Sequence, residues 1–316
     1  MKLTLVVAAL VAVLSAAVAD AATAPPVKLT GLTTWASTGS RLGYVATSAG
    51  GRRGYLWTQT YGAGEPRPLR TTAPIDEEEI DALAPGPNGT WGALERSIGN
   101  SGSTYTLDVV SSRGGGAKVT TSAQPIILVG DGTFLGYVAV TSSGTVQLYR
   151  VAGARGIHVA DLAGVTAPQD VAAANGHLAV RELDGSVVVL TDGGAQLATI
   201  PAKAASVALT ANRVVVRTRD RRLVVYGLGG GLVHNWKLSA ASWTAGLAAY
   251  GAYAVYLGAN KALHAVRLSS GSDRIVARAG SGFFFNGVAL QKAGALVPLS
   301  VGQTTTFRFV PTASLG

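Results

Sequence analysis

Four arginines lie within a six-residue segment, a spacing that brings several guanidinium groups to one place. They are Arg217, Arg219, Arg221 and Arg222, in RTRDRR. Guanidinium groups form paired hydrogen bonds with carboxylates and phosphates, so a cluster of them is able to hold an anion. The alternative is that the charges only solvate a hairpin tip, because the segment lies between two apolar runs. From the sequence, both interpretations stay open.

Carboxylates are concentrated in a second segment, IDEEEID, which contains Asp76, Glu77, Glu78, Glu79 and Asp81. Clustered carboxylates supply the hard oxygen ligands that Ca²⁺ prefers, and they also attract basic partners. A run of like charges is more commonly a solvated face, and the alternation of an EF-hand loop is missing. We expect this run to lie in a loop between two structural units.

The remaining chemistry-bearing residues form no local catalytic motif. The four histidines, His158, His177, His234 and His264, are far apart in the sequence, and there is no cysteine. The absence of cysteine excludes disulfides and thiolate metal sites. No Gly-x-Ser-x-Gly motif occurs, and no glycine cluster opens a helix after a strand. We therefore predict no catalytic, cofactor-binding or metal-binding residue.

The elements that carry the arginines are short β-strands. Val214 to Val216 and Leu223 to Tyr226 are β-branched or aromatic runs, and Leu232 to Leu238 alternates more loosely. Runs of this length between turn residues are typical of strands, and RDRR and GLGGG have the length of hairpin turns. The segment from Arg213 to Leu238 is therefore predicted to be a three-stranded antiparallel meander, which needs neighbours to bury its faces.

Those neighbours are repeats of the same unit. Turns equivalent to RDRR recur at intervals of roughly 40 residues, each followed by an apolar strand. They are Gly50-Gly51, Gly99-Asn100, Ser143-Gly144, Asp184-Gly185, Asp220-Arg221, Gly258-Ala259 and Gly302-Gln303. A repeat of this length that holds four strands is the signature of a propeller blade.

The last repeat ends after its third strand, TTTFRFVP, and so lacks an outer strand. The segment PPVKLTG, Pro25 to Gly31, precedes the first complete repeat and is able to supply that strand. Such pairing closes the ring and removes an open sheet edge. The prediction is an all-β, seven-bladed propeller of four-stranded antiparallel blades that spans residues 25–316. In the last repeat, the sequence leaves open whether Asn286-Gly287 or Lys292 to Gly294 is the turn.

Two segments resemble known propeller families. PNGTWGAL, Pro87 to Leu94, resembles the proline–aspartate–glycine turn of the WD-repeat-like propellers of the TolB type. LVVYGLGGGLVHNW, Leu223 to Trp236, resembles a repeat of the quinoprotein-type propellers. Gly-His occurs once, at Gly176-His177, and no Trp-Asp pair closes a blade. The resemblance implies the propeller fold.

In a four-stranded meander, the turn between strands two and three and the connection to the next blade leave on the same face. The arginine cluster, Lys261 and the acidic run are therefore expected on one side of the ring. Trp243 and Phe283 lie in connections on that side. Aromatic residues beside arginines are typical of binding hot spots, although aromatic residues in such positions also pack into the core.

The N-terminus has the pattern of a secretory signal peptide. Lys2 precedes an apolar run from Leu3 to Val18, and the small residues after it suit cleavage near residue 21. We expect residues 1–21 to be removed and the mature chain to be secreted or periplasmic. The run is also long enough to serve as an uncleaved anchor, and no later segment is apolar enough to span a bilayer.

The formal net charge is +9, with 26 Lys and Arg against 17 Asp and Glu. Such a charge attracts polyanions at long range, and it also keeps a protein soluble. We expect a monomer that binds a protein or an anionic envelope polymer, without nucleic acid. The sequence favours an exported, non-catalytic binding or scaffold module at the cell envelope. The alternatives are a propeller enzyme (a hydrolase, lyase or quinoprotein dehydrogenase) and a structural component of envelope assembly.

Overall fold

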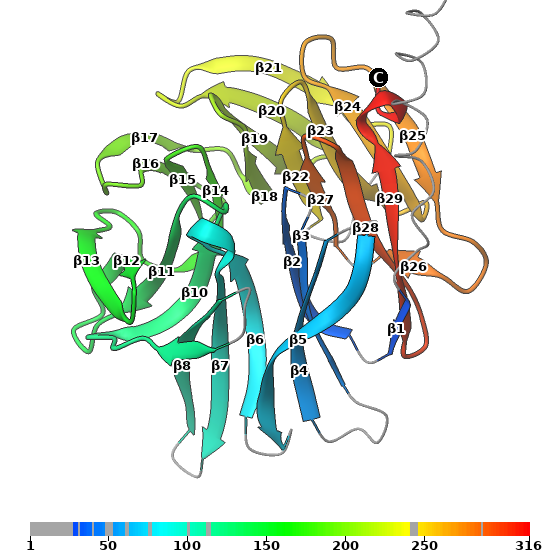
Figure 1. Ribbon diagram of the computed structural model, residues 1–316. Helices are drawn as coiled ribbons and strands as arrows, with labels where there is room; N and C mark the ends of the chain where they lie inside the picture. Colours follow the sequence, from blue (N-terminus) through cyan, green and yellow to red (C-terminus); the bar gives the residue numbers. More distant parts are fainter. Residues whose placement is uncertain are drawn as a thin grey trace, which may run out of the picture.

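The computed structural model describes residues 28–30, 32–39, 41–47, 53–60, 63–74, 78–99, 102–111, 115–240, 246–285 and 287–316. Its strands form antiparallel sheets arranged around a ring (Figure 1). The proposed signal peptide and Trp243 lie outside the described residues. No helix among the described residues is long and apolar enough to cross a membrane.

Six sheets each contain four strands in chain order, as a meander requires. The first three are β2–β5 (Leu32–Thr38, Arg41–Thr47, Arg53–Thr60, Ala63–Pro74), β6–β9 (Glu78–Pro85, Trp91–Gly99, Gly102–Val110, Gly116–Lys118) and β10–β13 (Gln124–Gly130, Leu135–Val140, Val146–Ala152, Arg155–Asp161).

The next three continue the pattern. They are β14–β17 (Pro168–Ala174, His177–Glu182, Val187–Thr191, Gln196–Ile200), β18–β21 (Ala204–Leu209, Arg213–Thr218, Arg222–Gly227, Leu232–Lys237) and β22–β25 (Leu247–Tyr250, Tyr253–Gly258, Ala262–Arg267, Asp273–Arg278). The meander predicted from Arg213 to Leu238 is confirmed as β19–β21.

One further sheet combines the two ends of the described chain. It contains β1 (Lys28–Thr30), β26 (Phe284–Phe285), β27 (Ala289–Gln291), β28 (Gly294–Val301) and β29 (Thr304–Pro311). β1 pairs antiparallel with β29, with Lys28 opposite Thr306 and Thr30 opposite Thr304. The predicted pairing between the segment before the first repeat and TTTFRFVP is therefore present.

The inner strand of this sheet is split into β26 and β27, and both segments pair with β28. The chain reverses at Lys292 and Ala293, between β27 and β28. Of the two turns that the sequence left open, the one at Lys292 to Gly294 is the hairpin.

The first strands of the sheets line the middle of the ring. Contacts run from β2 to β6, β10, β14, β18, β22 and β27 in turn, and β27 contacts β2 again. The chain therefore forms an all-β propeller of four-stranded antiparallel blades.

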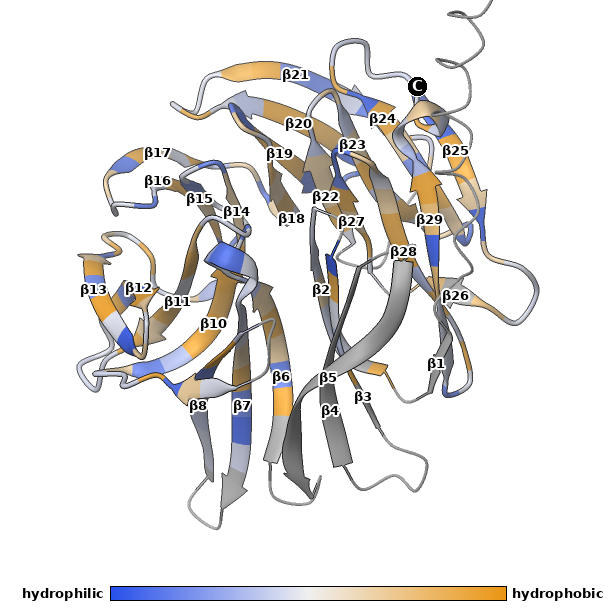
Figure 2. Cartoon of the chain, viewed as in Figure 1, coloured by the Kyte–Doolittle hydropathy of each residue, from blue (hydrophilic) through white to orange (hydrophobic). Residues whose placement is uncertain are grey.

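The core lies between neighbouring sheets, where apolar stretches along the strands face each other (Figure 2). One cluster joins Leu148 of β12 to Leu178 and Val188 of β15 and β16, all almost fully buried. Each buried side chain of this size contributes about 1.5–3 kcal/mol. Gly43 of β3 lies against the ring of buried Trp91, where an added Cβ would come within 2.9 Å of the indole. This contact packs the β2–β5 sheet closely on the β6–β9 sheet.

Candidate functional site

One face of the ring carries both the turns between second and third strands and the connections between sheets. Backbone hydrogen bonds join the two kinds of loop in three consecutive sheets. The amides of Ala204, Leu238 and Ala279 donate to the carbonyls of Gly185, Arg221 and Lys261, at 2.7, 2.8 and 2.9 Å. We call this side the connection face. The expectation that these loops share one side is confirmed for these sheets.

Cations are exposed in three neighbouring loops of the connection face. Arg219 and Arg221 lie in the β19–β20 turn, Lys261 lies in the β23–β24 turn, and Lys203 lies in the connection between β17 and β18. Three of these residues have left-handed backbone angles, with φ of 51° at Lys203, 65° at Arg221 and 56° at Lys261. Gly185 holds the equivalent position in the β15–β16 turn, at φ 88°. Cations thus stand in two turns where the local geometry favours glycine.

The turn around Arg221 is fixed by its own side chains. Thr218 donates its hydroxyl to Asp220 Oδ1 and accepts the amide of Arg222 at 3.1 Å. Arg222 is half-buried, and its Nε donates to Asn235 Oδ1 on β21 at 2.5 Å. Arg222 therefore braces the outer strand, whereas Arg219 and Arg221 face solvent.

The structure separates Arg217 from the other three arginines. Arg217 lies on β19 and is only 4% exposed. Its Nε donates to Ser206 Oγ on the paired strand β18 at 3.1 Å. Burial lowers the pKa of Arg217, and the nearby Tyr256 opposes that shift. Arg217 is thus a core residue and does not lie at the exposed hairpin tip.

Lys261 and Phe283 are placed on the predicted side of the ring, but with different surroundings. Lys261 is exposed, whereas Phe283 is half-buried and packs against the apolar cluster between the β22–β25 sheet and the last sheet. Phe283 therefore takes part in packing.

The acidic run is not a loop throughout. Glu78, Glu79 and Asp81 lie in β6, the inner strand of its sheet, with Glu79 opposite Arg96 of β7. Asp81 Oδ2 lies 3.3 Å from Arg96 Nε. Asp76 and Glu77 lie outside the described residues. Among the described residues, no three His, Cys, Asp or Glu side chains are grouped as metal ligands are.

A buried polar network, which the sequence did not predict, ties the connection after β21 to the β22–β25 sheet. Asp273 Oδ1 lies 3.0 Å from His264 Nδ1, and Asp273 Oδ2 accepts the Ser239 hydroxyl at 2.6 Å and the Tyr256 hydroxyl at 2.7 Å. The Ser239 amide adds a fourth contact at 2.8 Å. The imidazole stacks on the Tyr256 ring with centroids 4.7 Å apart. No local motif marks this network, because its members come from a connection and three strands.

This network has the residue types of a serine hydrolase but not the geometry. Ser239 Oγ and Asp273 both approach His264 Nδ1, at 3.3 and 3.0 Å. In a nucleophilic triad the serine faces the opposite ring nitrogen. Here His264 Nε2 lies 3.3 Å from Asn260 Oδ1. The arrangement suits a structural bridge, because Ser239 cannot pass its proton to the ring nitrogen that a triad uses.

The environment holds the Asp273 carboxylate in its charged form. Burial alone would raise its pKa, but hydrogen bonds from His264, Ser239 and Tyr256 outweigh burial and lower the pKa to about 2. The pKa of Tyr256 is raised, first by burial and then by the neighbouring Asp273. A carboxylate with this many donors is held as a fixed anion.

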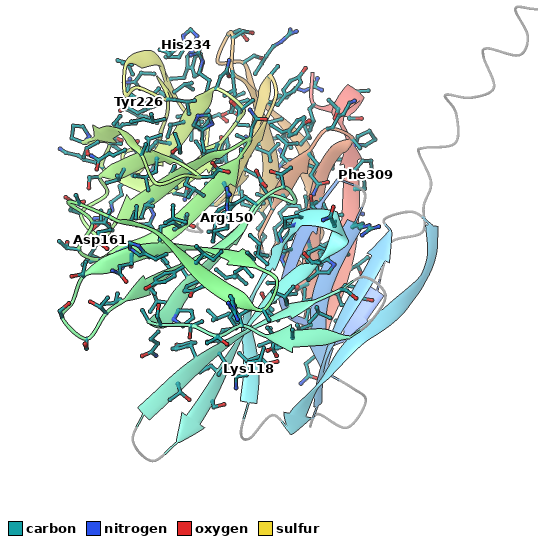
Figure 3. The ribbon with its side chains drawn as sticks, turned by 60° about the vertical axis from the view of Figure 1, so that its left-hand side comes forward. Lys118, Arg150, Asp161, Tyr226, His234 and Phe309 are labelled. Atoms are coloured by element: carbon teal, nitrogen blue, oxygen red, sulfur yellow. The ribbon has the colours of Figure 1, made fainter. Side chains whose placement is uncertain are left out.

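A second, exposed network lies on the β10–β13 sheet. Asp161, labelled in Figure 3, accepts from Gln147 at 2.7 Å and lies 3.0 Å from His158 Nε2. Hydrogen bonds from Gln147 and His158 lower the pKa of Asp161. Arg150, also labelled, donates to Asp192 Oδ2 at 2.6 Å and so bridges this sheet to the β14–β17 sheet. His158 is exposed on β13.

No protein-family model matches the sequence, and no curated protein matches it. Solved structures do resemble the fold. Sqt1 of Saccharomyces cerevisiae is similar with a TM-score of 0.55 and 12% identity, over 91% of this chain and 98% of Sqt1. The computationally designed Ika8 protein gives 0.55 and 14%, over 88% and 87% of the two chains. BamB from Moraxella catarrhalis gives 0.51 and 11%, over 90% and 98%. The resemblance at these identities shows the β-propeller fold, which is shared with WD40-type and PQQ-like propellers.

Proposed function

We propose that the chain is an exported, seven-bladed propeller that binds an anionic partner at the cell envelope through its connection face and catalyses no reaction. The contacts of β27 with the inner strands β22 and β2 support taking the sheet of β1 and β26–β29 as the seventh blade. The N-terminal apolar run after Lys2 supports export.

One observation carries the binding role: the exposed cations occupy left-handed turn positions. A residue other than glycine in this conformation costs of order 1–3 kcal/mol. Arg221 and Lys261 hold such positions in successive turns, although Gly185 shows that glycine serves in the equivalent turn. Folding alone does not explain a cation at these positions. A role for the charges explains it.

The polar networks support a non-catalytic role. Both carboxylate oxygens of Asp273 already accept hydrogen bonds, from Ser239, Tyr256 and His264. His264 is only 2% exposed. Acid–base catalysis requires a titratable group within reach of a bound substrate. The strongest candidate for such a group instead holds the connection after β21 against the β22–β25 sheet.

The test compares two variants of equal charge loss for binding to cell-envelope extract. The first combines Arg219→Ser, Arg221→Gly and Lys261→Gly on the connection face. The matched control combines Arg155→Ser, Arg267→Ser and Lys292→Ser, three exposed cations at turns on the opposite side of the strands. We expect the first variant to bind less extract at low salt, with the difference shrinking as salt rises, because screening weakens exposed charges.

The control distinguishes an effect of the connection face from an effect of the overall net charge. If both variants lose binding equally, only the overall charge matters and the connection face has no special role. If the first variant binds as the wild type does at low salt, the proposed function is wrong.

A further inference from the structure

An exposed leucine lies at the end of the row of cations. Leu183, in the β15–β16 turn, is 61% exposed, and its amide donates to the Ala167 carbonyl at 3.1 Å. It occupies the turn position that Arg219 holds in the next sheet. A single exposed leucine is ordinary on a protein surface. Leu183 differs in that its turn contacts the loops that carry the exposed cations.

Backbone contacts link the Leu183 turn to the loops that carry the cations. The Gly185 carbonyl accepts the Ala204 amide, which places the leucine turn against the loop that carries Lys203. Ala204 in turn pairs with Thr218, the residue before Arg219. We call the surface formed by Leu183, Lys203, Arg219 and Arg221 the basic ridge, and Lys261 lies in the next sheet along the same face.

The two carboxylates beside the basic ridge, Asp184 and Asp220, each accept a hydrogen bond within their own turn. Asp184 Oδ1 accepts the Ser186 amide at 2.8 Å, and Asp220 accepts the Thr218 hydroxyl. Arg219 and Arg221 are exposed in the turn that the Asp220 bond holds in shape, and Lys203 is exposed in the connection before β18. A ligand for the ridge therefore needs negative charges spaced along several loops and an apolar group at the Leu183 end.

We infer that the basic ridge binds an acidic protein segment that also carries apolar side chains. This inference rests on the proposed function and names the partner chemistry of the same face. Side-chain carboxylates pair with the Arg219 and Arg221 guanidinium groups, which favour planar acceptors. An apolar side chain of the partner covers Leu183 and removes it from water. A phosphate polymer meets the first requirement but has no group for the second.

The test measures the affinity of the full chain for purified probes. The first probe is a short labelled peptide rich in glutamate and leucine, the second is the same peptide with each leucine replaced by serine, and the third is inorganic polyphosphate. Leu183→Ser is compared with Leu232→Ser. Leu232 is a matched control because it is 63% exposed but lies at the start of the outer strand β21.

We expect Leu183→Ser to weaken binding of the leucine-containing peptide about five- to tenfold, because the variant loses the apolar contact between Leu183 and the peptide. A tenfold change in affinity corresponds to about 1.4 kcal/mol. Leu232→Ser should leave it unchanged, and the serine peptide should bind both variants and the wild type equally weakly. Arg221→Gly should weaken every anionic probe while the protein stays folded, because glycine suits φ 65°.

Two results would overturn the inference in distinguishable ways. If polyphosphate binds at least as tightly as the leucine peptide and Leu183→Ser affects neither, the ridge recognises an anionic polymer, and the proposed function stands without the peptide. If Arg221→Gly leaves the affinity for all three probes at the wild-type value, the basic ridge binds no anion and the proposed function falls with it.

Discussion

Replacing Asp273 by Asn should destabilise the propeller at neutral pH and remove part of its sensitivity to acid. The carboxylate accepts four hydrogen bonds, from the Ser239 amide and hydroxyl, from Tyr256 and from His264. Asparagine keeps one acceptor oxygen and puts an NH₂ group where the second stood. At least one buried donor then loses its partner, which costs about 1–3 kcal/mol.

The pKa of Asp273 gives an independent value for the stability that the carboxylate contributes. The pKa of Asp273 falls from 3.8 to about 2 on folding. Each unit corresponds to about 1.4 kcal/mol, so the charged form contributes roughly 2–2.5 kcal/mol of stability. Because the folded pKa is the lower one, this contribution is present above about pH 4. It is lost as the pH falls from about 4 to about 2. The side chain is 9% exposed, so solvent screens little of it.

Urea unfolding of the wild type and of Asp273→Asn, followed from neutral pH to about pH 2, measures both quantities. We expect the variant to be about 2 kcal/mol less stable at neutral pH and the gap to narrow on acidification. Asp161→Asn is the control, since its carboxylate also accepts hydrogen bonds but is exposed, and it should change stability little. Equal stability of wild type and Asp273→Asn at neutral pH, or a gap that stays constant down to about pH 2, would refute the reasoning.

Three further predictions address the fold and export. Deleting residues 25–31 should leave the edge of β29 unpaired and promote aggregation, which light scattering measures; unchanged solubility and melting temperature would contradict the closure. Gly43→Ala should cost about 1–3 kcal/mol, because the added methyl meets the buried Trp91 ring, whereas Gly193→Ala, with its nearest neighbour at 3.6 Å, should be nearly neutral in the same unfolding assay. N-terminal sequencing of the exported protein should give a start near Asp20 or Ala22, and a start at Met1 in the membrane fraction would indicate an anchor instead.

Much of the architecture follows from local sequence. The turns at Asp184-Gly185 and Asp220-Arg221 were located because turn chemistry is a short-range property, and each strand lies between two such turns. The pairing of β1 with β29 followed from counting strands. The split of the last inner strand into β26 and β27 was not predicted, because Asn286-Gly287 was considered as a hairpin turn and not as an interruption within one strand.

The site was predicted less well, for a physical reason. Second and third strands of a blade are buried on both faces, so the alternation that normally separates core from surface is absent. Arg217 was grouped with its neighbours in sequence, yet β19 is buried from Val214 to Thr218 and carries the arginine into the core. The Asp273 network depends on contacts between a connection and three strands, which no local motif in the sequence records. The left-handed angles at Lys203 and Lys261 were likewise visible only in the structure.

The pairing of Lys28 with Thr306 has a consequence for how the chain folds. Most strand pairs here form between neighbours in sequence and need only short loops to close. The β1–β29 pair closes a loop of almost the whole described chain, and the entropy cost of that closure must be met before the pair contributes any stability. The individual sheets are therefore expected to form early and the ring to be completed last. During synthesis β1 has no partner until β29 emerges, so the edges of the open ring are exposed to other chains in the interval between the two.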